Sequence, residues 1–224
     1  MKIDGINVYK SQINQHIEKR TTKIEYLVIH DTCNYGVGAN GAAHVRYFNT
    51  TERKASADFI IDEIGIYQIN DYKSYYTWHC GDGKGKFGIK NNNSVGLEIC
   101  VNKDGNYQAS VNNTIILTAY LMQELGISID RVVRHYDASR KLCPSSMVIN
   151  NWYKWTRFKS ALQEYIKLKD FENNTKIIPI KINDTVYMVR SINNNGYNYV
   201  NLRELCKLLN VSVDFKDNTV FLKH

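Results

Sequence analysis

The stretch KIEYLVIH (residues 23–30) decides the fold, because its β-branched and aromatic residues predict a buried strand that ends at His30. A second stretch, SVGLEICV (94–101), predicts another strand with strict alternation. Val95, Leu97, Ile99 and Val101 fall on one face, and Ser94, Gly96, Glu98 and Cys100 fall on the other. Glu98 is therefore expected on the face opposite the apolar residues.

Further helices and strands are expected around these two strands. The pattern predicts a short helix near 41–49, a hairpin over 57–70, a loop over 80–93, a helix over 111–125 capped by Gly126, and a longer helix over 146–169. In the last helix an apolar stripe is expected to be core; it consists of Trp152, Trp155, Phe158, Leu162 and Ile166. This order predicts an α/β fold with a central mixed β-sheet flanked by helices.

The chain is expected to contain two domains, 1–169 and 177–224, joined by the polar linker DFENNTK (170–176). The second domain is predicted to be a small α+β domain. Its elements are two strands joined at Asn183–Asp184, a turn at NNNG (193–196), a short strand, a helix LRELCKLL (202–209) ended by Asn210, and a last hairpin across KDN (216–218). About 50 residues is a marginal length for independent folding.

Composition limits the possible partners and the cellular compartment. A hydrophobic content of 43% with 23% charged residues is typical of a globular protein, and the formal charge of +7 favours an acidic partner. The basic residues are scattered, which argues against nucleic acid. Five cysteines without a CxxC pair indicate reduced thiols or metal ligands. No stretch is long enough to span a membrane, and MKIDGINVYKSQ lacks the features of a secretory signal, so we expect synthesis in the cytoplasm.

The stretch RVVRHYDASRKLCPSS (131–146) contains a histidine and a cysteine eight residues apart. Together with His30, His135 and Cys143 would form a set of two imidazoles and one thiolate, which suits zinc and leaves a fourth position open for water. Spacing alone leaves the alternative open that these are packed structural side chains.

Five segments occur in one order within residues 20–150: YLVIHDT, SADFIIDEIGIYQI, WHCGDG, NSVGLEICVN and RHYDASRKLCP. This order resembles the zinc-dependent N-acetylmuramoyl-L-alanine amidases of the amidase-2 type, a family that includes phage endolysins, bacterial autolysins and peptidoglycan recognition proteins. The resemblance implies one Zn²⁺ per chain. It also implies peptidoglycan as substrate, cut at the amide bond between N-acetylmuramic acid and L-alanine of the stem peptide.

The resemblance also implies roles for individual residues. His30, His135 and Cys143 match the zinc ligands, Glu98 matches the general base, and Lys141 matches the lysine that stabilises the oxyanion. His79 matches a position that lines the substrate groove, and Trp78 and Thr32 are expected beside it. Pairs of His79 with Cys80, or of His30 with Cys33, stay open as alternative ligands.

One feature of the sequence departs from the family pattern, and another excludes a competing motif. Some members carry a Tyr–His pair before FII, where this chain has Ala57 and Asp58, so the expected catalytic role falls more heavily on Glu98. The segment GDGKGKFG (81–88) lacks the GK[ST] ending of a phosphate-binding loop, and we expect it to form the rim of a groove for glycan.

The segment YVNLRELCKLLNVSVDFKDNTVFL (199–222) resembles the small domain named for the N-terminus of copper amine oxidase, which occurs on clostridial surface proteins. It has no His/Met/Cys cluster for copper. We expect it to bind the wall, through anionic polymers, or to dimerise, and the oligomeric state stays open.

Two functions are weighed on this basis. The first is a wall hydrolase of a phage or prophage with a clostridial host, which reaches the wall after the membrane is breached. The alternative is a non-catalytic protein that binds muropeptides. In this family the loss of the cysteine ligand marks the non-catalytic state, so Cys143 favours the hydrolase.

Overall fold

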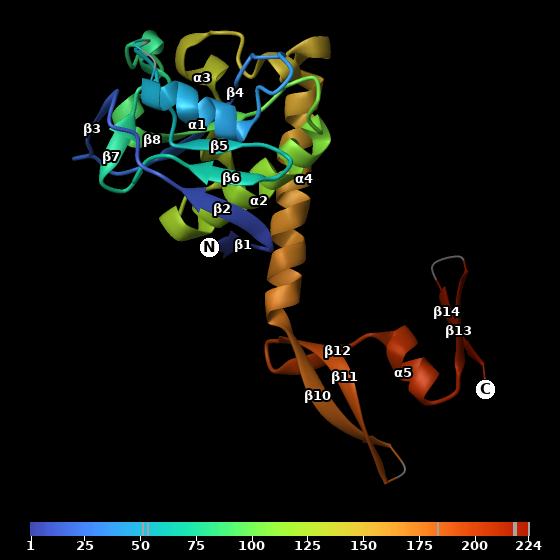
Figure 1. The fold of residues 1–224 in the computed structure, drawn as a ribbon. Helices are drawn as coiled ribbons and strands as arrows, with labels where there is room; N and C mark the ends of the chain where they lie inside the picture. Colours follow the sequence, from blue (N-terminus) through green and yellow to red (C-terminus); the bar gives the residue numbers. More distant parts are fainter. Residues whose placement is uncertain (51, 53, 183, 217–218, 224) are drawn as a thin grey trace. The chain divides into compact units, whose positions relative to one another are not determined.

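The computed structural model describes residues 1–223 except 51, 53, 183, 217 and 218. It divides the chain into two units, Met1–Tyr165 and Ile166–His224 (Figure 1). Each unit has its own β-sheets.

The first unit is built on a seven-stranded sheet with the order β1-β2-β6-β5-β8-β4-β9 (Figure 1). Its strands are β1 (Lys2–Ile3), β2 (Ile6–Lys10), β4 (Tyr26–Asp31), β5 (Phe59–Ile61), β6 (Gly65–Gln68), β8 (Ser94–Ile99) and β9 (Val132–Arg134). The run β5-β8-β4-β9 is parallel, whereas β5 and β6 form the antiparallel hairpin expected over 57–70. The predicted central mixed sheet is confirmed. A separate two-stranded sheet pairs β3 (Ile17–Lys19) with β7 (Tyr75–Thr77).

Helices cover both faces of this sheet (Figure 1). Helix α1 (Gly41–Thr50) packs through Phe48 in one buried cluster with Ile60 of β5. Helix α2 (Tyr107–Leu125) covers the other face. It starts four residues before the expected position because the Asn106 side chain accepts a hydrogen bond from the Ala109 amide. It ends as expected at Gly126, whose φ of 65° suits glycine.

Strand β8 is buried on both sides. Val95, Leu97 and Ile99 are fully buried, as the alternation predicts. Ser94 is fully buried as well, although it shares a face with Glu98. This second face is therefore not a solvent face; it carries Glu98 toward the interior of the unit.

Two expectations for the region after residue 145 are corrected. A 3₁₀ turn (η4, Ser145–Met147) precedes α4, which is assigned over Ile149–Asn174 and is interrupted at residues 150–152 by positive φ angles. Trp152 and Trp155 are half-buried and do not lie in the core. Instead they pack under the Arg134 guanidinium, whose Cζ lies 4.3 Å from the ring centroid of Trp152 and 5.8 Å from that of Trp155. Phe158 is buried as predicted.

The segment 170–176 is not an irregular linker. Helix α4 continues to Asn174, and β10 begins at Thr175. Polar side chains satisfy the last helical carbonyls instead of ending the helix early: Asn174 Nδ2 donates to Asp170 O (2.8 Å) and Thr175 Oγ1 donates to Phe171 O (2.8 Å).

The second unit has the order of elements that the sequence predicts. Strands β10 (Thr175–Ile182), β11 (Thr185–Asn194) and β12 (Tyr197–Val200) form an antiparallel sheet. Helix α5 (Leu202–Leu208) and the hairpin β13 (Ser212–Lys216) and β14 (Thr219–Lys223) follow. Of the expected turns, Asn183, Asp217 and Asn218 lie outside the described residues. In the described part of the chain, no helix combines the length and the apolar character needed to cross a membrane.

Candidate metal centre and catalytic site

The carboxyl ends of three neighbouring parallel strands meet at the site. His30 is the next-to-last residue of β4, Glu98 is the next-to-last residue of β8, and His135 begins α3 (His135–Ser139) directly after β9. His30 and Glu98 are register partners across the β4–β8 pair. Ligands in α/β folds bind at this edge of the sheet, and the side chains brought together here are polar.

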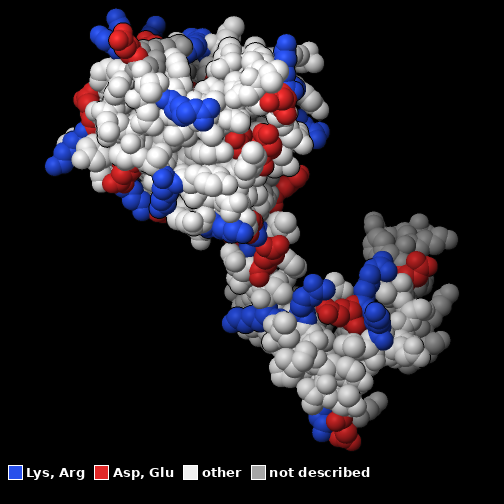
Figure 2. Space-filling model, viewed as in Figure 1, with Lys and Arg blue, Asp and Glu red and all other residues white. Residues whose placement is uncertain are grey.

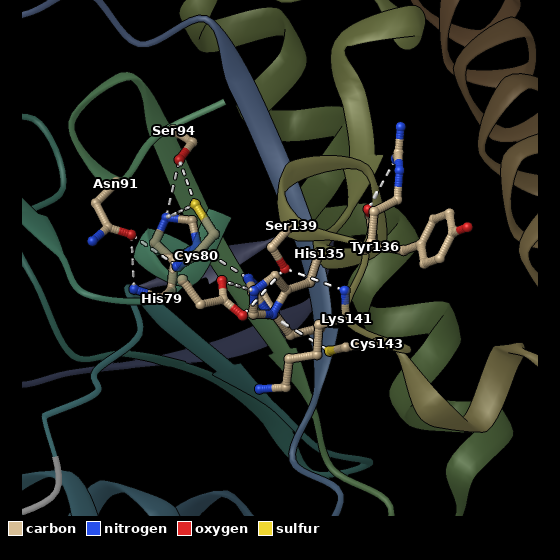
Figure 3. A network of polar contacts seen from close by, with 12 residues as sticks. His79, Cys80, Asn91, Ser94, His135, Tyr136, Ser139, Lys141 and Cys143 are labelled. Atoms are coloured by element: carbon tan, nitrogen blue, oxygen red, sulfur yellow. Dashed lines mark hydrogen bonds and ion pairs between the residues drawn. The ribbon is translucent and has the colours of Figure 1, made fainter. Parts of the chain in front are cut away.

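Cys143 lies on the loop that follows α3, and this loop is tied to the end of β4. The buried carboxylate of Asp31 accepts hydrogen bonds from Ser145 Oγ (3.1 Å) and from the amide of Ser146 (2.6 Å). These bonds fix the chain just after Cys143, whose Sγ lies 3.7 Å from His30 Nδ1. Figure 3 shows Cys143 close to His135 and Lys141.

The three predicted ligands form one buried cluster. His30, His135 and Cys143 are 1%, 3% and 6% exposed, and they offer ligand atoms that lie within 4.8 Å of one another. His135 Nε2 bonds Asp82 Oδ1 at 2.7 Å, whereas His135 Nδ1 is buried without a hydrogen-bond partner. A buried nitrogen without a partner calls for a ligand. Two imidazoles and one thiolate are donors that zinc prefers, and three protein ligands leave a fourth position open. The residues therefore fit zinc.

Burial sets the protonation of these groups. It lowers the pKa of His30, and the charges of His135 and His79 lower it further. It also lowers the pKa of His135, against the raising effect of Asp82. Both imidazoles are therefore neutral near pH 7, which is the form that binds metal. Burial raises the pKa of the Cys143 thiol, and the charge of Glu98 adds to this shift. Metal binding at Cys143 must therefore release a proton.

Two further side chains hold the ligand imidazoles. Asp82, in the 3₁₀ turn η1 (Gly81–Gly83), bonds His135 and also accepts from Ser139 Oγ at 3.2 Å. His79 Nδ1 lies 3.0 Å from His30 Nε2. The composition of residues 81–88 predicts a groove rim but does not connect Asp82 with His135. A metal-binding histidine generally needs a hydrogen-bond partner for its second ring nitrogen. This rule predicts that His135 has such a partner but does not identify Asp82.

A cavity of about 600 Å³ opens over the cluster, a size typical of small-molecule sites. The predicted base Glu98 and the predicted oxyanion partner Lys141 both line it. Glu98 is partly buried and Lys141 is exposed. A carboxylate and an ammonium thus face the same space as the three ligands, which is the arrangement needed for proton transfer and charge stabilisation.

The predicted substrate residues Thr32, Trp78 and His79 also line this cavity. Thr32 Oγ1 is buried without a hydrogen-bond partner. The Trp78 indole donates to Glu18 Oε1 at 3.0 Å, which holds the ring in place. Helix α1 contributes a further wall of the cavity that the sequence patterns do not predict; it consists of Ala43, His44, Tyr47 and Phe48.

The alternative ligand pairs are not supported. Within the described residues, the cluster suited to a metal comprises His30, His135 and Cys143, without Cys33 or Cys80. Cys33 is exposed, and Cys80 Sγ instead lies 3.7 Å from Ser94 Oγ.

Asp58, which stands where some family members have histidine, is a buried structural residue. Its carboxylate accepts hydrogen bonds from Asn70 Nδ2 (2.7 Å), Thr77 Oγ1 (2.9 Å) and the amide of Gly96 (2.8 Å). Burial raises the pKa of Asp58, and these bonds oppose the shift. Asp58 is not among the residues that line the cavity.

Comparisons with known proteins agree with this geometry. A family profile described as N-acetylmuramoyl-L-alanine amidase matches residues 20–146. The N-acetylmuramoyl-L-alanine amidase XlyA of Bacillus subtilis (strain 168) is 36% identical over 140 residues, which cover 61% of this chain and 43% of XlyA. The chain thus matches less than half the length of this relative.

Two solved structures share the fold. The catalytic domain of XlyA superposes with a TM-score of 0.61 at 34% identity, over 70% of this chain and 99% of that chain. A structure described as a mutant endolysin from Bacillus subtilis gives a TM-score of 0.63 at 34% identity, with the same coverage of both chains. The match covers 99% of each solved chain, so the likeness extends over a whole domain.

Proposed function

The chain belongs to the N-acetylmuramoyl-L-alanine amidase family, and we propose that it hydrolyses the amide bond between the lactyl group of N-acetylmuramic acid and L-alanine in peptidoglycan. The observation that carries this proposal is the convergence of His30, His135 and Cys143 under a cavity lined by Glu98 and Lys141. The names of the relatives support the same reaction.

His30, His135 and Cys143 would hold the zinc ion. When bound, zinc supplies Lewis acidity, which polarises the scissile carbonyl and lowers the pKa of a water to about 7. Glu98 takes a proton from the attacking water and delivers it to the leaving nitrogen of L-alanine. The Lys141 ammonium stabilises the negative charge that develops on the carbonyl oxygen. Thr32, Trp78 and His79 would contact the muropeptide in the cavity.

The metal and the activity can be measured on the same samples. The purified full chain is expected to contain one zinc ion and to clear a suspension of purified walls. The Cys143→Ser variant is expected to lose both. A wild-type protein that clears walls after complete removal of metal by a chelator would contradict the zinc mechanism. A zinc-loaded protein that binds walls without cutting them would instead be a recognition protein.

We also propose that the second unit binds the wall. Its sequence has nine Lys and Arg against six Asp and Glu over residues 166–224, an excess of three positive charges. Figure 2 shows basic side chains on the visible face of this unit, interspersed with acidic ones. Apolar side chains are also exposed on one face of the β10–β12 sheet: Ile177 (66%), Val186 (60%), Met188 (61%), Tyr197 (70%) and Tyr199 (58%). An exposed apolar face with positive charge nearby suits an anionic wall polymer.

Co-sedimentation with purified walls tests this role. The double variant Tyr197→Ser/Tyr199→Ser is expected to bind walls less tightly than the wild type. The matched control is Tyr153→Ser, because Tyr153 is 55% exposed but lies in the first unit. Equal binding by all three proteins would contradict the proposal. Loss of a dimer in the double variant, seen by analytical ultracentrifugation, would assign this face to dimerisation.

We propose further that the protein acts as an endolysin of a phage or prophage with a clostridial host, made in the cytoplasm and active on the wall after release. The likeness to an endolysin structure supports the first part. Lysis rates on walls from clostridia and from bacilli test the second part. Faster lysis of bacillus walls would contradict a clostridial host.

A further inference from the structure

A chain of hydrogen bonds leads from the metal centre to a backbone carbonyl. His30 Nε2 lies 3.0 Å from His79 Nδ1, and His79 Nε2 lies 3.1 Å from Ser94 Oγ. Ser94 Oγ lies 2.5 Å from the carbonyl oxygen of Lys90. His30, His79 and Ser94 are all buried. Figure 3 shows the His79 ring between Ser94 on one side and the ligand cluster on the other.

The Lys90 carbonyl, at the end of this series of hydrogen bonds, fixes the direction of every bond in the series. The Lys90 carbonyl can only accept, so the Ser94 hydroxyl must donate to it. Ser94 has a single proton and therefore accepts from His79 Nε2–H. A neutral imidazole carries one proton, so His79 Nδ1 is an acceptor, and His30 Nε2–H donates a hydrogen bond to it. What remains on His30 is a lone pair at Nδ1, the atom that faces Cys143 Sγ at 3.7 Å.

We propose that His79 and Ser94 are positioning residues that select the metal-binding tautomer of His30. The Lys90 carbonyl sets the order of donors and acceptors, and the two side chains carry this order to the ligand. His30 thereby presents Nδ1 to the metal before any metal arrives. His135 is prepared in the same sense by the Asp82 carboxylate, which holds its Nε2–H.

The surroundings of His79 are built to keep its ring in this position. Gly96 of β8 lies against the ring: a Cβ on Gly96 would come within 2.6 Å of His79 Cγ. Asn91 Oδ1 accepts from the amides of His79 (3.1 Å) and Cys80 (2.8 Å), which anchors the backbone. The ring therefore packs closely against Gly96, while hydrogen bonds to Asn91 hold the backbone that carries it.

The inference rests on the proposed metal centre but not on wall hydrolysis, so its test uses no substrate. Two quantities are measured on the full chain: the zinc affinity, by competition with a chromophoric chelator, and the tautomer of His30 in metal-free protein, by long-range ¹H–¹⁵N NMR of ¹⁵N-histidine. The variants are Ser94→Ala, Ser94→Thr, His79→Leu and His79→Asn. The Asn side chain can keep an oxygen acceptor near the position of Nδ1. The matched control is Ser110→Ala, because Ser110 of α2 is also buried and donates to the carbonyl of Asn106, the N-cap residue of α2, away from the site.

Metal-free wild type is expected to carry the His30 proton on Nε2. Ser94→Ala and His79→Leu should weaken zinc binding by about 10- to 100-fold and mix the two tautomers. Ser94→Thr and His79→Asn should recover much of the affinity, and Ser110→Ala should match wild type. A proton on His30 Nδ1 in the wild type, or unchanged affinity in both Ser94→Ala and His79→Leu, overturns the inference. If wild type shows the Nε2 tautomer but binds no zinc, the proposed metal centre fails and the hydrogen-bond order stands.

Discussion

Glu98 stands directly opposite His30 in the parallel pairing of β4 with β8. The candidate base and a candidate ligand are therefore held by two adjacent strands in the interior of the sheet, and their separation does not depend on a loop. Sites on regular elements are held more exactly than sites on loops. Lys141 and Cys143, by contrast, lie on the segment after α3, which is tied to β4 through Asp31.

Replacing Glu98 by Gln should remove catalysis without removing the metal. The amide keeps the size of the side chain but cannot take a proton, so the hydrolysis rate should fall by about 100-fold or more. Zinc content should equal that of wild type. Glu164→Gln, an exposed change on α4, is the control. A Glu98→Gln enzyme that keeps more than about a tenth of the rate would exclude Glu98 as the base.

Removal of the Asp82 carboxylate should weaken metal binding. Asp82→Ala deprives His135 Nε2 of its partner, and zinc affinity should fall by about 10- to 100-fold. Asp82→Asn keeps a hydrogen-bond acceptor without the charge, so its zinc affinity should lie between those of wild type and Asp82→Ala. Asp184→Asn, where the carboxylate is 95% exposed in the second unit, controls for loss of a negative charge. Chelator competition measures the zinc affinity. Equal zinc affinities of Asp82→Ala and wild type would show that the contact between Asp82 and His135 does not support metal binding.

Gly96→Ala should destabilise the first unit. The new methyl group would come within 2.6 Å of His79 Cγ, which is the base of the ring and not the tip of a flexible side chain, so β8 or the ring must shift. Overpacking of this kind costs about 1–3 kcal/mol in the free energy of unfolding. Urea denaturation followed by tryptophan fluorescence measures it. At Gly36 the nearest atom, the tip of the Asn34 side chain, lies 3.2 Å away, so Gly36→Ala should cost less. A Gly96→Ala midpoint equal to that of wild type would contradict the close approach.

One of the five cysteines should react quickly with a thiol reagent. Cys33 is exposed, whereas Cys80, Cys100, Cys143 and Cys206 are buried. Burial also raises the pKa of the Cys80 thiol to about 12, which keeps it protonated and unreactive. Titration with a chromogenic disulfide should show one fast thiol in the native chain, absent in Cys33→Ser, and five after denaturation. Two or more fast thiols in the native wild type would show that the buried cysteines are accessible.

The strands that carry the site could be predicted from sequence because their patterns are strong. The apolar run that ends at His30 and the alternation around Glu98 each fix a strand and a face. Convergence of His135 and Cys143 on His30 could not be derived from spacing, since it depends on the order of β4, β8 and β9 in the sheet. The resemblance to a known family supplied that step.

The parts that sequence did not predict depend on contacts between distant segments. Asp82 meets His135 across 53 residues, and His79 meets His30 across 49, through loops that carry no periodic pattern. The sequence predicts a helix from residue 146, but α4 begins at Ile149 and is interrupted at residues 150–152 by positive φ angles. Helical periodicity does not reveal such an interruption. The end of α4 was misplaced because Asn and Thr, read as turn formers, instead bond the last carbonyls.

The most direct test of the central claim is the mass spectrum of soluble fragments released from purified peptidoglycan by the zinc-loaded chain. We expect stem peptides that begin with L-alanine carrying a free amino group, together with glycan strands whose lactyl groups end in free carboxylates. Stem peptides cut at another bond, or glycan fragments with new reducing ends, would contradict hydrolysis of the proposed amide bond.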